Sequence, residues 1–206
     1  MLFVLFLYIY ILKDFLSTLS KYNALAIGPG LSTNEAAIEM MELVLQSWKG
    51  SLVVDADGLN ILATNKEWLS RLPKGTVLTP HIGEFKRLIG EKDLPINYLE
   101  CLRDFTSEYQ VTVILKNSIT AIAEPNGNIT FSDFGDASLA TAGSGDVLCG
   151  LILALLANGY SSEEAAKLGV YLHSRAGVLA GKQNSQESAL ASDIAANIGN
   201  AFRELY

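Results

Sequence analysis

The chain contains few of the residues that stabilise very small or metal-dependent proteins. Its 206 residues include two cysteines, Cys101 and Cys149, and two histidines, His81 and His173. The cysteines are distant in sequence and form no CxxC pair, so the sequence has neither a disulfide framework nor the signature of a zinc or haem site. A chain of this length buries roughly 70% of its unfolded surface without such links. We therefore expect reduced thiols and no protein-bound metal.

Positive charge is also scarce. The chain has 15 Lys and Arg against 22 Asp and Glu, a formal net charge of -7, and only 18% of its residues are charged. This acidic balance argues against a general nucleic-acid binder, because phosphate backbones are held by basic surfaces. The apolar half of the composition excludes a disordered or low-complexity protein. An anionic ligand would have to be held locally, by helix N-termini and a few lysines.

The first twelve residues, Met1–Leu12, form an uninterrupted apolar run. The run is too short to span a bilayer as a helix, and it has neither the basic leading region nor the small-residue cleavage site of a secretory signal. Its aromatic and β-branched residues favour a buried strand or a core helix, with a membrane anchor or an artefact of where the chain begins as alternatives. We assign residues 1–21 as an apolar head of uncertain role and expect a cytoplasmic protein with no membrane partner.

After residue 22, short apolar runs alternate with segments of helical period. The expected strands are Ala24–Ile27, Leu52–Val54, Thr76–Thr79 and Val111–Leu115, followed by a hairpin over Thr120–Ser132 that turns at Pro125-Asn126-Gly127. The expected helices are Asn34–Trp48 (capped by Ser32 or Thr33), Tyr98–Tyr109, Val147–Ala157, Ser161–Ala180 and Ser192–Leu205, with Ser161 and Glu164 as a capping box. This alternation predicts one domain, an α/β sandwich with a largely parallel sheet.

Polar segments recur where these strands end. They are Gly28-Pro29-Gly30, Asp55–Asn60, Thr79-Pro80-His81, Lys116–Thr120 and the glycines before Val147. In open α/β sheets, ligands bind beyond the carboxyl ends of the strands. The convergence of five polar segments at one edge of the sheet predicts a small-molecule site there.

The most informative segment is Thr141-Ala142-Gly143-Ser144-Gly145-Asp146, which opens an apolar helix. Small residues let the backbone approach a ligand, and the free N–H groups of the first helical turn favour an anion such as phosphate. Asp146 would stand beside that anion as a base for phosphoryl transfer. The alternative is a loop in which Asp146 only caps the helix. The segment is neither a Walker loop nor a GxGxxG motif.

Three other candidates have weaker signals. Asp55–Asn60 fits a polar floor for a ribose, a phosphate-bound magnesium or a water network, or else a turn capped by Asp57. Lys116, at the end of a buried strand, is expected to reach an anion or a carboxylate, because unpaired burial is costly. Taken alone, His81 reads as a hydrogen-bonded loop residue and His173 as a structural residue of an apolar helix.

Six motifs occur in the order found in a known enzyme family. They are Ala26–Leu31, Val54–Asn60, Leu78–Phe85, Leu115-Lys116, Ala142–Gly150 and Val170–His173. Together they resemble the ADP/ATP-dependent NAD(P)H-hydrate dehydratases of the ribokinase-like superfamily, over about Tyr22 to Lys182. The resemblance implies a ribokinase-like three-layer sandwich.

The resemblance also implies a function. These enzymes dehydrate the S form of NAD(P)H hydrate to NAD(P)H with ADP or ATP as co-substrate and Mg²⁺, and relatives form tetramers, so a homo-oligomer is expected. Asp146 would be the catalytic base and contact the substrate. The remaining substrate contacts would be Gly30, His81, Asp57 and Asn60. The nucleotide would be bound by Lys116, Asn117, Ser118, Ile119 and Thr120, with Gly143, Ser144 and Gly145 around its phosphate.

The sequence differs from the family pattern in several places. Family members usually have glycine at the position of Ser32, and they often have proline at that of Ile82 and glycine at that of Asn117. They also carry strands before the Gly-Pro-Gly turn, so residues 22–206 are expected to form a dehydratase-like domain without its usual N-terminal part and without a fused epimerase domain. A ribokinase-like vitamin or sugar kinase, or a catalytically silent nucleotide-binding remnant, are the alternatives.

Overall fold

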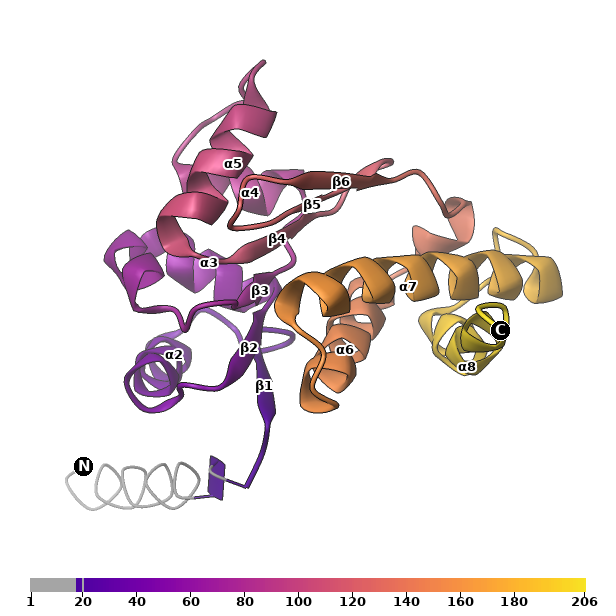
Figure 1. Ribbon diagram of the computed structural model, residues 1–206, viewed down its shortest axis with the longest axis horizontal. Helices are drawn as coiled ribbons and strands as arrows, with labels where there is room; N and C mark the ends of the chain where they lie inside the picture. Colours follow the sequence, from indigo (N-terminus) through magenta and orange to yellow (C-terminus); the bar gives the residue numbers. More distant parts are fainter. Residues whose placement is uncertain (1–17, 20) are drawn as a thin grey trace.

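The computed structural model describes residues 18, 19 and 21–206, and the expectations for Met1–Leu12 fall outside the described residues. Six strands form one sheet, with helices packed on both of its faces (Figure 1). The expected three-layer α/β arrangement is thus confirmed. None of the described helices has the length and apolar content needed to cross a bilayer.

The sheet runs in the order β1-β2-β3-β4-β5-β6. The strands are β1 (Ala24–Ile27), β2 (Ser51–Val54), β3 (Val77–Leu78), β4 (Thr112–Leu115), β5 (Thr120–Ala123) and β6 (Ile129–Ser132). Strands β1 to β4 are parallel to one another. Strand β5 is antiparallel to β4, and β6 is antiparallel to β5. The largely parallel sheet and the hairpin predicted at Asn126-Gly127 are both confirmed, and four parallel strands end at the same edge.

Seven α-helices lie in the described part of the chain. They are α2 (Glu35–Ser47), α3 (Ala56–Thr64), α4 (Ile82–Ile89), α5 (Tyr98–Tyr109), α6 (Ser144–Ala157), α7 (Ser162–Asn184) and α8 (Ala191–Arg203). Helix α5 has the predicted bounds, and α7 begins with the predicted capping box of Ser161 and Glu164. The predicted cap of α2 was wrong, because the side chain of Asn34, and not Ser32 or Thr33, accepts the N–H of Ala37.

Two helices that directly follow strands were not predicted. Helix α3 starts at Ala56, where the Asp55 side chain accepts the Ala56 N–H, so the interpretation of a turn capped by Asp57 was wrong. Helix α4 starts after His81, whose ring accepts N–H groups of the first turn while Glu84 accepts the His81 N–H. Both caps are polar residues at a strand end, a pattern that short turns share.

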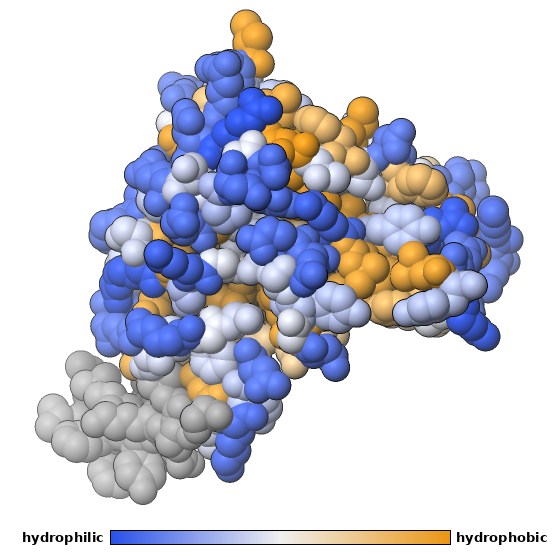
Figure 2. Space-filling model, in the orientation of Figure 1, coloured by the Kyte–Doolittle hydropathy of each residue, from blue (hydrophilic) through white to orange (hydrophobic). Residues whose placement is uncertain are grey.

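The core has a cluster on each face of the sheet. Alternate strand residues point to opposite sides, so Val54 and Leu115 pack with α2 to α5, whereas Val53 and Ile114 pack with α6 and α7. A third cluster joins α7 to α8. Figure 2 shows apolar side chains gathered at the surface along α7, where an open cavity of about 500 Å³ is lined by Tyr160, Glu164, Lys167, Leu168, Tyr171 and Leu205.

Candidate active site

The loops after the parallel strands are in direct contact. The Lys116 N–H donates to the Pro80 carbonyl at 2.8 Å, which joins the ends of β3 and β4. Between the ends of β1 and β2, Gly28 has a φ of +127°, and a Cβ there would lie 1.8 Å from the Asp55 carbonyl oxygen. Only glycine fits this contact. The predicted convergence of polar segments is therefore confirmed.

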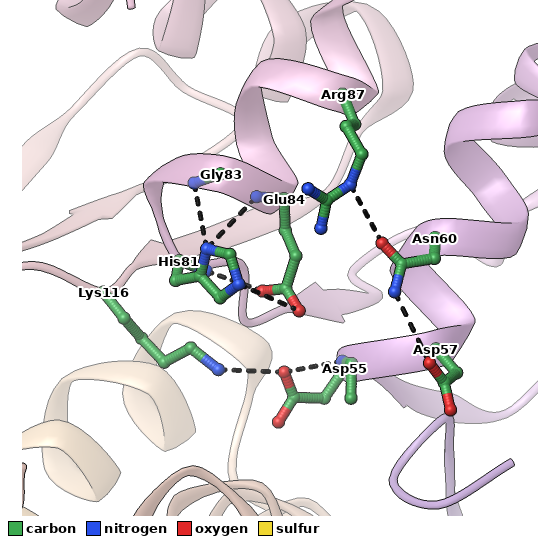
Figure 3. A network of polar contacts seen from close by, with 9 residues as sticks. Asp55, Asp57, Asn60, His81, Gly83, Glu84, Arg87 and Lys116 are labelled. Atoms are coloured by element: carbon green, nitrogen blue, oxygen red, sulfur yellow. Dashed lines mark hydrogen bonds and ion pairs between the residues drawn. The ribbon is translucent and has the colours of Figure 1, made fainter. Parts of the chain in front are cut away.

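An ion pair between Lys116 and Asp55 occupies the centre of this edge (Figure 3). The Lys116 Nζ lies 2.9 Å from Asp55 Oδ1, and Asp55 is only 1% exposed. The expectation that Lys116 reaches a carboxylate or an anion is thus met by Asp55. A Cβ built on Gly145 would lie 3.5 Å from the Lys116 Nζ. The ammonium group therefore stands beside the first turn of α6.

The N-terminus of α6 has free hydrogen-bond donors. Its N-cap, Gly143, has a φ of +84° and provides no side-chain cap. The Ser144 N–H donates to the Thr141 carbonyl at 3.2 Å, but the N–H groups of Gly145 and Asp146 have no acceptor among the described residues. Two free N–H groups at the positive end of a helix, next to a lysine, form an anion site.

Asp146 is the third residue of α6 and is exposed. No described residue forms a hydrogen bond or an ion pair with its carboxylate. The interpretation of Asp146 as the helix cap was therefore wrong, because the cap position belongs to Gly143. A carboxylate one residue from Gly145, and free of partners in the described structure, is available to accept a proton from a bound group.

Asp57 and Asn60 belong to a polar network on the other side of Asp55 (Figure 3). Asp57 Oδ2 accepts the Ser32 N–H at 2.8 Å. Asn60 Oδ1 accepts from Arg87 Nε at 3.0 Å, as Figure 3 shows. Asn60 Nδ2 lies 3.5 Å from Asp57 Oδ1. The network ties the loop after β1 to α3 and α4. Sequence reasoning did not include Arg87, because its role depends on a helix that was not predicted.

His81 is held at the start of α4. Its Nδ1 accepts the N–H groups of Gly83 at 2.9 Å and Glu84 at 3.2 Å, and its Nε2 lies 3.6 Å from Glu84 Oε1. Because Nδ1 is an acceptor, Nε2 carries the proton. The prediction of a hydrogen-bonded residue is confirmed, but in a helix cap. Its side chain is 55% exposed, so a face of the ring is open to a ligand.

A cavity of about 740 Å³ lies between the Lys116–Thr120 segment, α6 and α7. Of the predicted nucleotide-binding residues, Lys116, Asn117, Ser118, Thr120, Ser144 and Gly145 line it. The side chain of Ile119 is 54% exposed, and this residue lines a neighbouring cavity of about 500 Å³ instead. His81, which was predicted to contact the substrate, also lines the larger cavity, whereas Gly143, Asp146, Gly30, Asp57 and Asn60 do not.

Part of the cavity wall was missed at the level of sequence. It includes Phe134, Gly135, Asp136 and Leu139 before α6, and Val170, His173 and Ser174 on α7. The last three recur at helical spacing, which was a usable signal for one face of α7. The expectation that His173 is structural is met in part, because its buried ring bonds Ser144 and also lines the cavity.

In the part of the chain that the structure describes, neither the cysteines nor the possible metal ligands add a reactive group to this site. Cys101 and Cys149 are both free, as expected for reduced thiols. Burial raises the pKa of Cys149 to about 12, with the Asp55 carboxylate adding to the effect, so this thiol is not a nucleophile at neutral pH. Among the described residues, no three His, Cys, Asp or Glu side chains group in a way that could hold a metal ion.

A parallel sheet with an anion site and a lysine at its carboxyl edge defines the class of nucleotide-binding α/β proteins. The family model described as NAD(P)H-hydrate dehydratase matches residues 6–200. The chain belongs to the NAD(P)H-hydrate dehydratase family, which confirms the resemblance read from its motifs.

Individual relatives agree with this assignment. A bifunctional NAD(P)H-hydrate repair enzyme of Moorella thermoacetica is 40% identical over 185 residues, which are 89% of this chain and 35% of the relative. An ADP-dependent (S)-NAD(P)H-hydrate dehydratase of Neisseria meningitidis is 39% identical over 79% of this chain and 57% of its own length. The chain thus spans about a third to somewhat over half of these relatives.

Solved structures show the same fold. The ADP/ATP-dependent NAD(P)H-hydrate dehydratase of Bacillus subtilis, co-crystallised with ATP and Mg²⁺, superposes with a TM-score of 0.75 at 30% identity, over 90% of this chain and 65% of that chain. A ribokinase-like superfamily protein of Enterococcus faecalis superposes with a TM-score of 0.79 at 25% identity, over 93% and 66%. The ribokinase-like fold is thereby confirmed.

Proposed function

We propose that the chain catalyses the ADP-dependent dehydration of the S form of NAD(P)H hydrate to NAD(P)H. The observation that carries the proposal is the first turn of α6, where two free N–H groups, the Lys116 ammonium and the unpaired Asp146 carboxylate lie together. The names of the relatives supply the substrate class. What the turn supplies is the chemistry for moving a phosphoryl group onto a hydroxyl.

The first step transfers the terminal phosphoryl group of ADP to the hydroxyl of the hydrate. The N–H groups of Gly145 and Asp146 bind the phosphoryl oxygens, and Lys116 offsets their charge. The substrate oxygen forms a bond to phosphorus as the bond from phosphorus to AMP breaks. Asp146 accepts the hydroxyl proton.

The second step is elimination. Hydroxide is a poor leaving group, whereas a phosphorylated hydroxyl leaves readily. The lone pair of the ring nitrogen expels phosphate, and loss of a proton from the neighbouring carbon restores the ring double bond. The products are NAD(P)H, AMP and phosphate, so the atoms of the lost water end in the phosphate and in the released protons.

The two sides of Asp55 would receive the two substrates. The cavity of about 740 Å³ is large enough for an adenine nucleotide, and most of the predicted nucleotide-binding residues line it. The hydrated dinucleotide would lie against Gly30, the open face of His81, and the network of Asp57 and Asn60. The reacting hydroxyl would then meet the phosphoryl group at α6, between the two.

Three further points belong to the same proposal. Magnesium enters as the complex of the nucleotide phosphates, the form in which enzymes commonly bind it, and a relative was crystallised with ATP and Mg²⁺. The protein acts in the cytoplasm as a homo-oligomer. Residues 22–206 act as a dehydratase-like domain. Light scattering of the purified chain and fractionation of cells test the assembly and the location.

The test is a direct assay. The purified chain is incubated with (S)-NADPH hydrate, ADP and Mg²⁺, and the reduced-nicotinamide absorbance is followed, with Asp146→Asn as the control. Recovery of absorbance with release of AMP supports the proposal. Loss of ADP without recovery indicates a kinase for another substrate. Nucleotide binding without turnover indicates a silent remnant, and either result contradicts the proposed function.

A further inference from the structure

His173 connects α7 to the first turn of α6. Its side chain is buried, and its Nε2 lies 2.9 Å from the Ser144 carbonyl oxygen and 3.2 Å from Ser144 Oγ. A carbonyl oxygen only accepts hydrogen bonds, so Nε2 carries the proton and donates it. The two bonded residues are 29 positions apart in the sequence and lie on different helices, and both line the nucleotide cavity.

The acceptor of this bond is half of the peptide unit that contains a free donor. The Ser144 carbonyl and the Gly145 N–H belong to the same planar peptide, and in a trans peptide they point in opposite directions. The direction of the carbonyl therefore fixes the direction of the N–H. By holding the Ser144 carbonyl on the α7 side, the imidazole aims the Gly145 N–H away from it.

Apart from backbone hydrogen bonds such as that from the Val147 N–H to the Gly143 carbonyl, the first turn of α6 has no side-chain cap to hold it. Gly143 and Gly145 flank Ser144, and glycine leaves the backbone dihedrals free. The N-cap provides no side-chain hydrogen bond, unlike those of α3, α4 and α7. Burial, together with the nearby Lys116 ammonium, lowers the pKa of His173 to about 4, so the ring is neutral at physiological pH. A neutral donor anchors the peptide without adding charge to the anion site.

We propose that His173 is a positioning residue, which orients the Ser144–Gly145 peptide so that the Gly145 N–H binds the terminal phosphoryl group of the nucleotide. The inference rests on the proposed function for the identity of that nucleotide. It goes beyond it by assigning a role to a residue that does not itself move a proton in the reaction. Loss of the hydrogen bond weakens phosphate binding and leaves binding of the dinucleotide hydrate unchanged.

Two amide substitutions separate the hydrogen bond from the bulk of the ring. His173→Gln places an amide N–H near the position of Nε2, whereas His173→Asn is too short to reach Ser144. We expect ADP binding with Mg²⁺, measured by calorimetry, to stay within threefold of wild type for His173→Gln and to weaken at least tenfold for His173→Asn. Binding of the hydrate changes less than twofold in both.

A packing control and a second measurement keep the test independent of general instability. Leu172→Ala removes a fully buried side chain from the α7–α8 cluster without touching Ser144. We expect it to lower the melting temperature but to leave the ADP affinity within twofold. Hydrogen exchange of the segment 143–150 without ligand should accelerate in His173→Asn and not in His173→Gln.

The results test the role of His173 separately from the proposed dehydration reaction. Equal ADP affinities for His173→Asn and wild type, or equal losses for the Gln and Asn variants, overturn it, as does a wild type that binds no ADP. A wild type that binds ADP but does not dehydrate the hydrate contradicts the proposed function, and the ADP affinities still judge His173.

Discussion

The two sides of Asp55 are built differently. On the side of α3 and α4, polar groups are paired with each other: Asp57 with the Ser32 N–H, Asn60 with Arg87, and the His81 N–H with Glu84. On the side of α6, two N–H groups and the carboxylate of Asp146 have no partner in the described chain. Paired groups shape a surface, whereas unpaired groups at a helix N-terminus are available to a ligand. The chemistry is therefore expected at α6 and the fit of the substrate at α3 and α4.

Asp146→Asn tests whether the unpaired carboxylate on the α6 side is the catalytic base, and it has the largest expected effect. The amide has nearly the same shape as the carboxylate but does not accept the hydroxyl proton. We expect kcat to fall by roughly 100- to 10,000-fold. The affinity for ADP should remain within about threefold, because the backbone N–H groups are unchanged. Steady-state kinetics and calorimetry measure the two values. A kcat within tenfold of wild type would show that Asp146 is not the base.

Lys116→Met tests whether the ammonium serves the nucleotide or only Asp55. We expect ADP binding to weaken by roughly 10- to 100-fold, the loss of one charged hydrogen bond, with little change for the hydrate. The free energy of unfolding should fall by about 3 kcal/mol, because Asp55 is left buried without a counter-charge.

The double variant Lys116→Met/Asp55→Asn separates these two effects. Replacing the carboxylate by an amide removes the unpaired charge, so denaturant unfolding should show most of the stability restored. ADP binding should stay weak. Recovery of ADP binding in the double variant would mean that Lys116 contributes through Asp55 alone, and the two sides would then not be distinct.

The pH dependence of the unfolding free energy tests whether His173, which contacts α6 at Ser144, is neutral in the folded protein. Burial lowers the pKa of His173 to about 4, below its ordinary value of 6.5, so the unfolded chain binds more protons between these pH values. The stability that depends on the neutral ring is complete above pH 6.5 and is lost as the pH falls toward 4. We expect His173→Gln to lose about 3 kcal/mol less than wild type over this range. Chemical denaturation at several pH values measures the difference. Parallel curves for the two proteins would contradict a buried neutral histidine.

The sequence predicted best the elements whose signals are local. Strand β1, helix α5 and the capping box at Ser161 depend on nearby residues only, and their positions are correct. Helices α3 and α4 were missed, because Asp55 and His81 follow shortly after a strand and at the same time cap a helix. A polar pair after a strand has the same composition in a turn and in a cap.

The site was predictable to the extent that it follows strand ends. The motif around Gly145 and the lysine at the end of β4 both follow from the rule that ligands bind at the carboxyl edge of a parallel sheet. The wall formed by Val170, His173 and Ser174 depends on how α7 crosses α6, which is set by packing between distant residues. The helical spacing of these three residues indicates that they share one face of α7, but it does not indicate that this face meets the cavity.

The smallest expected effect concerns the paired side. Ser32 has a φ of +71°, in the left-handed region where a side chain is strained, and its N–H still donates to Asp57. Ser32→Gly removes the strain but also the contact of Ser32 Oγ with the Asn34 N–H at 3.3 Å. We expect a net gain of about 0.5 kcal/mol in unfolding free energy and an unchanged ADP affinity.

Gly127→Ala is the matched control, because Gly127 has a φ of +86°, open space around it and a place in the hairpin far along the chain from Ser32. It should lose about 1 kcal/mol. If Ser32→Gly lowered the stability instead, the hydroxyl contact would outweigh the backbone strain, and the loop after β1 would be held by its side chains and not by the backbone bond to Asp57.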